Sequence, residues 1–454
     1  MFQSKKIYKE VFFFSIPLIL SMFTQQFYNV ADTMIVGRFL GVNELAAVGN
    51  AGTMVMLLIV VSGGFEFASE IIFSRYYGKN DLKQIASGAV NVMSFAFVIS
   101  ILFMILGFLF LPTIYQWIQL PQELIPLTNT YLLTYMLGVP FIYIYDISRA
   151  ILTALGDSKH CFYFVLGSSC TNIILDLLLI CVCHLGVFGA ALATIVSQMI
   201  FMFVAFFYLY TKIKDYPGFT LKPHFHKEQI LELMHVTIPS IVQQFVITCS
   251  FIFIQSMINP FGSEIISGFV AVNKVITLSR IVFLGFTQAF SIYAARLIVA
   301  KDYQIIKDIY IFLAKISLIY VSLISLCFLI IPHLFCMPFF SIETYQKGYM
   351  FFKVYLQCSI PMLLISVFKY MNESLLRSAM HMTSFLISNL SDLFVKVIST
   401  YILLSFISTN AFWLGETLGK SLSSILSFIL VFIIIKKTHL KERNLYKLRS
   451  FYHS

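Results

Sequence analysis

The chain has 454 residues, of which 59% are hydrophobic and 11% are charged. In soluble domains about a quarter of the residues are charged. The low charged fraction and a mean hydropathy of +0.88 exclude a water-soluble fold and indicate a protein that lies in a lipid bilayer. The formal charge of +10 is therefore interpreted as a signal for membrane orientation rather than for nucleic-acid binding.

Twelve apolar segments follow one another along the chain, each long enough to cross a bilayer as a helix. The first six lie near residues 11–36, 46–73, 87–112, 128–154, 160–183 and 187–211. The other six lie near residues 233–258, 266–295, 307–332, 349–375, 380–407 and 411–435. The sequence predicts an all-α integral membrane protein with twelve transmembrane helices.

The basic residues indicate how these helices are oriented. With both termini in the cytoplasm, the external loops contain only Arg38 and Lys347 among the Lys and Arg residues, as the positive-inside rule requires. We expect a multi-pass protein of the plasma membrane with cytoplasmic termini.

The two sets of six helices repeat one another. Four pairs of residues recur at separations of 220 to 222 residues: Pro17 and Pro239, Gly41 and Gly262, Pro112 and Pro332, Pro140 and Pro361. Because each half contains an even number of helices, both halves enter the membrane in the same sense. We expect an N-terminal bundle at 1–211, a cytoplasmic linker at 212–232, and a C-terminal bundle with a basic tail at 233–454.

Proline inside a lipid-embedded helix frees a backbone carbonyl and bends the helix. We therefore predict that Pro17 is a hinge in the first helix. The alternative is that the matched prolines reflect packing geometry alone.

Acidic residues at membrane depth are costly, so each one requires a partner or a function. Most have a basic residue three or four positions away, at a spacing that brings helical side chains together. These acids are Asp146 with Arg149, Glu373 with Lys369 and Arg377, Asp392 with Lys396, and Glu416 with Lys420. Asp32 and Asp176 have no base within four residues.

Asp32 and Asp176 each share a helix face with amides. Gln25, Asn29 and Asp32 form one row, and Asn172 lies one turn before Asp176. With Thr194 of the sixth helix, the two acids are expected roughly 6 to 11 Å below the outer helix ends, because a helix rises 1.5 Å per residue. This set suits a proton or a hard cation such as Na⁺. The alternative is a structural hydrogen-bond cluster.

Glu66 and Glu70 lie one turn apart in the second helix. They are candidates for secondary proton carriers. The alternative is that they line a water-filled cavity, with Glu70 paired to a base on another helix.

Several runs resemble the multidrug and toxic compound extrusion (MATE) family of antiporters. They are IPLILSMFTQQFYNVADTMIVGRFLGVNELAAVGNAG at residues 16–52, SRYYGKND at 74–81, LTALGDSK at 152–159, TNIILD at 171–176 and GVFGAALAT at 186–194. The resemblance implies that Asp32, Asn172, Asp176 and Thr194 bind the coupling ion. The second half departs from the family in two places. The seventh helix has Gln243, Gln244 and Gln255 where some members carry an acid. After the eighth helix, ARLIVAKD from residue 295 stands where the family usually has Asn and Gly-Ala.

We expect a secondary active efflux transporter that exchanges H⁺ or Na⁺ for amphipathic, cationic or neutral, drugs or metabolites by alternating access. The weaker candidates for the cargo site are Gln25, Tyr28, Asn29 and Gln244. We expect no enzyme activity, no cofactor beyond the coupling ion, no metal site and no nucleic-acid partner, and we expect a monomer. The alternatives are a flippase for lipid-linked saccharides or other amphiphiles, and a receptor or channel that does not couple transport to an ion.

Overall fold

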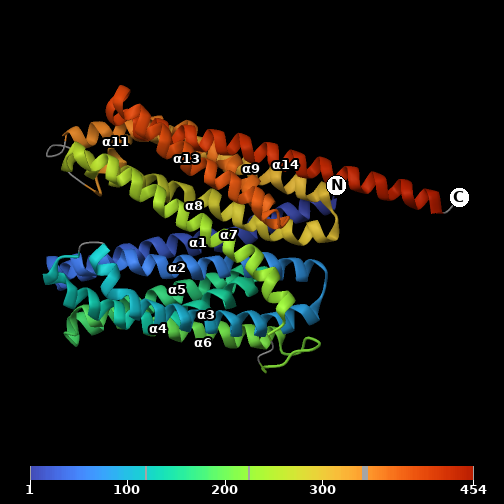
Figure 1. The fold of residues 1–454 in the computed structure, drawn as a ribbon, viewed down its shortest axis with the longest axis horizontal. Helices are drawn as coiled ribbons and strands as arrows, with labels where there is room; N and C mark the ends of the chain where they lie inside the picture. The colour runs from blue at the N-terminus through green and yellow to red at the C-terminus, as the bar shows by residue number, and fades with distance from the viewer. Residues whose placement is uncertain (1, 118–119, 223–224, 340–345, 453–454) are drawn as a thin grey trace. The chain divides into compact units, whose positions relative to one another are not determined.

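The computed structural model describes residues 2–117, 120–222, 225–339 and 346–452 (Figure 1). Within these ranges the chain is helical and contains no strand. The first half contains α1 (Phe2–Phe39), α2 (Val42–Gly78), α3 (Leu82–Trp117), α4 (Ile125–Ala154), α5 (Ser158–Asp176) and α6 (Gly186–Ile213). The second half contains α7 (Lys227–Ile258), α8 (Ser263–Ala300), α9 (Tyr303–Ile330), α10 (Pro332–Cys336), α11 (Gln346–Cys358), α12 (Ile360–Ser378), α13 (Met382–Ile407) and α14 (Ala411–Tyr452).

The predicted membrane-crossing segments coincide with these helices. Ten apolar helical stretches of the described chain are long enough to span a bilayer, and α11 and α12 together form a further span that is bent by 46°. One of the ten, Met382–Lys436, contains both α13 and α14, which pack against each other and are separated by the short turn Ser408–Asn410. At about 20 residues per crossing, that stretch holds two spans. The prediction of twelve transmembrane helices in an all-α membrane protein is confirmed.

The internal repeat is visible in the backbone of the connections. Residues with positive φ recur at matching places in the two halves: Gly41 (123°) and Gly262 (90°), Asn80 (56°) and Lys301 (60°), Gly186 (59°) and Ser408 (51°). A positive φ is uncommon outside glycine, so these three pairs at nearly constant separation indicate three helix connections that each occur once in either half. The repeat differs at the fourth helix of each half. There α4 continues through Pro140, whereas α12 begins anew just before Pro361.

Packing divides the chain into two compact units. Unit 1 comprises Met1–Phe245 and Ile292–Ile306, and unit 2 comprises Val246–Ser291 and Lys307–Ser454. The borders lie inside α7, α8 and α9, so each of these helices contributes to both units. The expected linker at 212–232 falls within unit 1, and the bundle boundaries drawn from the sequence stay a prediction.

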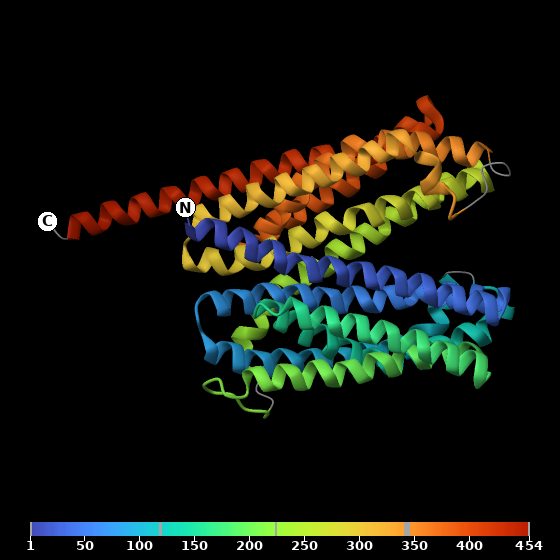
Figure 2. The same ribbon diagram turned by 180° about the vertical axis from the view of Figure 1, so that it is seen from behind.

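In unit 1, helices α1 to α6 lie side by side (Figure 2). Helix α4 packs against α2, α3 and α6, and α1 packs against α5. Small buried residues such as Ala51, Ala190 and Ala191 let the helix backbones approach closely, as is common where helices associate in lipid.

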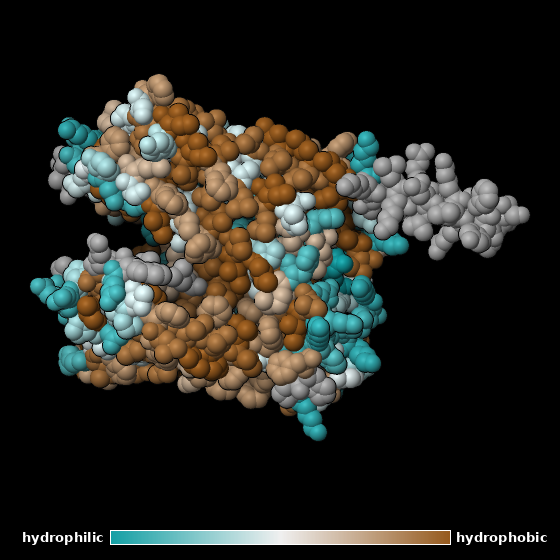
Figure 3. Space-filling model, in the orientation of Figure 1, coloured by the Kyte–Doolittle hydropathy of each residue, from teal (hydrophilic) through white to brown (hydrophobic). Residues whose placement is uncertain are grey.

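In unit 2, α14 packs against α12 and α13. A cluster of buried aromatic and aliphatic side chains fills the space near α8 and α11, including Phe269, Phe283, Phe328, Phe352 and Phe412. The outer faces of the helices are apolar in both units, and hydrophilic residues gather at helix ends (Figure 3). This distribution is the one that a bilayer requires of a protein that spans it.

The last turns of α8 pack within unit 1. Arg296 donates from Nη2 to the carbonyl oxygen of Ala154 at 2.7 Å, and its guanidinium lies 4.7 Å from the ring centre of Tyr77. The hydroxyl of Tyr293 donates to Glu10 at 2.9 Å. A Cβ atom at Gly78 would lie 2.6 Å from the carbonyl oxygen of Arg296, so the end of α2 meets the α8 backbone directly.

Candidate ion site

Helices α1, α5 and α6 bring the predicted ion-site residues together in unit 1. Helix α5 ends at Asp176 and continues as a π-helical turn over Leu177–Val182, in which the N–H of Cys183 reaches the carbonyl of Leu178 at 2.9 Å. A π-turn widens the helix and appears frequently at functional sites. Asp176 is therefore placed where the α5 backbone departs from regular α-helical geometry.

Asn172, Asp176 and Thr194 form a buried cluster, with exposed fractions of 2%, 0% and 5%. The amide of Asn172 satisfies its neighbours when its nitrogen donates to Asp176 Oδ2 at 3.0 Å and its oxygen accepts from the hydroxyl and backbone N–H of Thr194 at 3.3 and 3.2 Å. The Oδ1 atom of Asp176 has no hydrogen-bond partner among the described residues. One buried carboxylate oxygen is thus available as an acceptor or a cation ligand.

Asp32 of α1 lies next to this cluster. Its carboxyl group is half-buried and lies close enough to the carboxyl group of Asp176 for the two to interact electrostatically. Ionised carboxylates are acceptors only, so two of them that lie this close favour a shared proton or cation. The predicted convergence of Asp32, Asp176, Asn172 and Thr194 is what the structure shows; their role in coupling stays a prediction.

Three tyrosines surround the acids. Tyr28 of α1 lies close to both Thr194 and Asp32. Tyr131 and Tyr135 of α4 are buried, stack with a centroid separation of 6.1 Å, and lie close enough to Asp32 for electrostatic interaction. Sequence reasoning missed the α4 pair, although its spacing of four residues places both rings on one helix face. The tyrosines offer hydroxyl groups as further oxygen ligands near the acids.

The candidates for the cargo site are less well grouped. Tyr28 belongs to the acid cluster, but Gln25 and Asn29 are exposed. The Asn29 carbonyl accepts a hydrogen bond from the Thr33 hydroxyl at 2.8 Å. Gln244 is half-buried on α7. The assignment of these residues to a cargo site stays a prediction.

Glu66 belongs to a second polar group in unit 1. Arg149 Nη2 lies 2.7 Å from Glu66 Oε1 and 3.3 Å from Asp146 Oδ1, so the predicted pair of Asp146 and Arg149 is present and also contains Glu66. The hydroxyl of Ser62 donates to Asp146 Oδ2 at 2.7 Å. Glu70 is buried, at 4% exposure. The role of Glu66 and Glu70 as secondary proton carriers stays a prediction.

Helix α1 runs unbroken through Pro17. Proline has no N–H, so the carbonyl one turn earlier loses its usual helical partner. The hydroxyl of Ser21 donates to the Pro17 carbonyl at 2.8 Å. The hinge function of Pro17 stays a prediction.

The acids of unit 2 are paired differently from what the sequence indicates. Lys369 does meet Glu373, at 3.3 Å. Asp392 instead contacts Lys369 of α12 at 2.8 Å, together with Lys420 of α14. Glu416 contacts Arg280 at 3.1 Å and Lys396 at 3.9 Å. Partners on neighbouring helices approach these acids more closely than the bases four residues away.

Asp157 fixes the start of α5. Its side chain accepts from the backbone N–H of His160 at 3.2 Å and from the hydroxyl of Tyr208 at 2.8 Å. Burial alone raises the pKa of the Asp157 carboxyl, but hydrogen bonds from His160 and Tyr208 outweigh burial and hold its pKa below the ordinary value. Asp157 therefore caps α5 as an anion and anchors it to α6.

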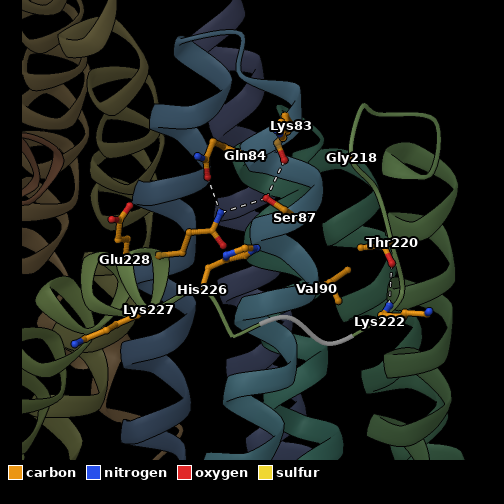
Figure 4. A pocket seen from close by; sticks show the side chains of 11 residues that line it. Lys83, Gln84, Ser87, Val90, Gly218, Thr220, Lys222, His226, Lys227 and Glu228 are labelled. Carbon is orange, nitrogen blue, oxygen red and sulfur yellow. Dashed lines mark hydrogen bonds between the residues drawn. The ribbon is translucent and has the colours of Figure 1, made fainter.

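A cavity of about 670 Å³ in unit 1 lies away from the acids (Figure 4). It lies between the start of α3 and the segment before α7, and its wall includes Lys83, Ser87 and His226. In Figure 4 the side chain of Lys227 points away from Ser87 and Gln84. Because neither Asp32 nor Asp176 lines it, this cavity is separate from the candidate ion site.

Comparison with known proteins supports the interpretation of the fold. The family model MatE matches residues 17–178. The probable multidrug resistance protein YpnP of Bacillus subtilis (strain 168) is 31% identical over 274 residues, which cover 60% of this chain and 61% of YpnP. The probable multidrug resistance protein YoeA of the same strain is 27% identical over 311 residues, which cover 67% of each chain.

Solved structures extend the likeness to nearly the whole chain. A crystal structure of the Vibrio cholerae MATE transporter VcmN superposes with a TM-score of 0.89, covering 96% of this chain and 99% of that one at 15% identity. The segment that matches the family model includes Asp32 and Asp176, and the helical fold is shared along nearly the whole chain. The likeness to MATE proteins is therefore carried in sequence by residues 17–178 and, along nearly the whole chain, by the fold.

Proposed function

We propose that the protein is a secondary active efflux transporter that exchanges H⁺ or Na⁺ for amphipathic drugs or metabolites by alternating access. The observation that supports this most strongly is the contact between the Asp32 and Asp176 carboxyl groups in unit 1, beside an unpartnered oxygen of Asp176. Intramembrane acids without a basic partner mark ion pathways in transporters.

The surrounding residues can bind either ion. A proton shared by Asp32 and Asp176 would remove the repulsion between two carboxylates. Sodium would instead take oxygen ligands from these acids, from the Asn172 amide and from the hydroxyls of Tyr28 and Thr194. Since Asp32 is half-buried while Asp176 is buried, Asp32 is the first acceptor for an incoming ion.

Coupling requires that the ion bind one conformation of the protein more tightly than the other. We propose that an ion bound from outside neutralises the two acids, changes the packing of α1 against α5, and favours release of cargo outward. Loss of the ion to the cytoplasm restores the acids and with them the affinity for cargo. Because the site is anionic, charge complementarity favours cationic or neutral amphipathic cargo.

The remaining parts of the proposal concern the setting. We propose that the protein acts as a monomer in the plasma membrane with both termini cytoplasmic, as the distribution of basic residues favours. It requires no cofactor other than the coupling ion, and it has neither enzyme activity nor a nucleic-acid partner.

Gradient-driven efflux from membrane vesicles tests the proposal. Vesicles with wild type or Asp32→Asn are loaded with a cationic dye, and efflux is measured with an imposed pH gradient and, separately, with an imposed Na⁺ gradient. Wild type should respond to one of the gradients, and Asp32→Asn should lose that response.

Glu123→Gln is the matched control, because Glu123 is an exposed acid in the connection before α4. It should transport like wild type. Coupled efflux at wild-type rates in Asp32→Asn would remove the exchange mechanism. Transport of lipid-linked saccharides without either gradient would favour a flippase instead.

A further inference from the structure

Two groups of charged side chains lie among α8, α12, α13 and α14 of unit 2. In the first, Lys369 and Lys420 contact Asp392, and Lys369 also contacts Glu373, so two cations meet two anions. The hydroxyl of Ser388 adds a hydrogen bond to Glu373 at 2.8 Å. This group is balanced in charge and tightly bonded.

The second group has more positive than negative charge. Here Glu416 forms ion pairs with two cations, Arg280 at 3.1 Å and Lys396 at 3.9 Å. The other oxygen of Glu416 accepts from the hydroxyl of Tyr355 at 2.8 Å. The single carboxylate therefore faces two cations and accepts from one hydroxyl, and one positive charge is left uncompensated.

The two cations also have unused hydrogen-bonding capacity. Arg280 uses Nη2 for Glu416 and for the sulfur of Met362, both at 3.1 Å, while its buried Nε has no hydrogen-bond partner among the described residues. Lys396 approaches Glu416 only to 3.9 Å, beyond hydrogen-bond distance. Both side chains are partly accessible, with exposed fractions of 16% and 19%.

An excess cation in a low-dielectric interior is costly unless a counter-charge satisfies it. A carboxylate or sulfonate has two or more oxygens, which match the Nε–H of Arg280 and the ammonium group of Lys396 together. A neutral amphiphile offers no such compensation, and a cationic one would be repelled.

A neighbouring cavity suits the apolar part of such a molecule. It has a volume of about 450 Å³ and is lined mainly by apolar and aromatic side chains, including Phe351, Tyr355 and Trp413. The charged residue in its wall is Lys347, and among the described residues that line it there is no acid. Tyr355 lines the cavity and also bonds Glu416, so cavity and charged group share a wall.

We propose that unit 2 binds the anionic group of an amphipathic molecule between Arg280 and Lys396, with its aromatic body against the cavity near Tyr355. This rests on the proposed transport function and extends its cargo to aromatic carboxylates and sulfonates. Lys396 determines this specificity because it is the cation that the protein itself satisfies least.

Equilibrium binding to the purified full-length protein tests the proposal without any ion gradient. The probes are fluorescein and rhodamine 123, which share a xanthene core but carry opposite charges. Lys396→Gln should weaken fluorescein binding about tenfold, as loss of one charge-assisted contact predicts, and leave rhodamine 123 binding unchanged. Lys396→Arg should retain fluorescein binding. Lys315→Gln, which removes an exposed lysine of α9 in the same unit, is the matched control.

A second variant is expected to strengthen fluorescein binding instead of weakening it. Glu416→Gln removes the carboxylate that competes for Arg280 and Lys396, so fluorescein should bind more tightly than to wild type. Thermal unfolding of each variant establishes that it is folded. Absence of fluorescein binding by wild type, or an equal loss of both dyes in Lys396→Gln, would overturn the proposal. Because no gradient is applied, these outcomes do not depend on whether Asp32 couples transport to an ion.

Discussion

Acids occur within the membrane-spanning helices of both units, but their surroundings differ. In unit 1, Asp32 and Asp176 meet each other with amide and hydroxyl neighbours. In unit 2, Asp392 and Glu416 each contact two basic side chains. A carboxylate held by a lysine or arginine has its counter-charge built in, whereas two carboxylates in contact require one from outside. Asp32 and Asp176 of unit 1 are therefore suited to exchange an ion, whereas Asp392 and Glu416 of unit 2 are suited to hold helices together.

Breaking the ion pairs of unit 2 should have the largest effect. Lys369→Met removes a cation that contacts both Asp392 and Glu373 and is 1% exposed. Removing one partner of a buried pair leaves an uncompensated charge, and the free energy of unfolding should fall by about 3–5 kcal/mol. Thermal unfolding of the purified protein measures this. The double variant Lys369→Met with Glu373→Gln should recover part of the loss, and equal stability of all three proteins would contradict the structural role.

Introducing into unit 1 a lysine–carboxylate pair like that of Lys369 and Glu373 should have the next largest effect. Asn172→Lys places a cation one turn from Asp176, at the spacing that Lys369 has to Glu373. The lysine should occupy the carboxylate permanently, so gradient-driven efflux should fall on the order of 100-fold, equivalent to about 2.7 kcal/mol. Vesicle efflux measures the change, with Asn172→Gln as the uncharged control. Full coupled efflux with a lysine at this position would show that Asp176 is dispensable.

The smallest effect concerns the caps of two corresponding helices. Asp157 caps α5 with its side chain, whereas His381, before α13, makes no side-chain cap. Asp157→Ala should lower the free energy of unfolding by about 0.5–2 kcal/mol, and His381→Asp should raise it by up to a similar amount. Chemical unfolding of the purified protein measures both changes.

The cap of Asp157 should also depend on pH. Its folded-state pKa is depressed, so its contribution is complete above the ordinary aspartate pKa and is lost as the pH falls through the folded value. The difference between wild type and Asp157→Ala should therefore shrink in acid. A difference that grows as the pH falls would contradict the depressed pKa.

The sequence alone was sufficient for the features that depend on spacing along the chain. Hydropathy predicts the helices, and the repeated Gly41 and Gly262 both occupy turns with positive φ. The search for acids without a nearby base found Asp32 and Asp176, which the structure places in contact. These predictions succeed because lipid imposes helices and makes an unpaired acid exceptional.

Features that depend on packing between helices could not be predicted in this way. The partners of Asp392 and Glu416 are set by which side chains of α8, α12, α13 and α14 face one another, so sequence distance is no guide. The π-turn after Asp176 has no sequence signal in an apolar run such as LLLICV. Tyr131 and Tyr135 share a helix face that hydropathy does not distinguish from ordinary core.

Helices α7, α8 and α9 each pass from one unit to the other without leaving helical geometry. A loop at such a border would swing freely, but a continuous helix resists bending because its backbone hydrogen bonds must stretch. Any cycle that moves one unit against the other therefore stores elastic energy near residues 245, 291 and 306. Such bending would favour whichever conformation leaves α7, α8 and α9 straightest.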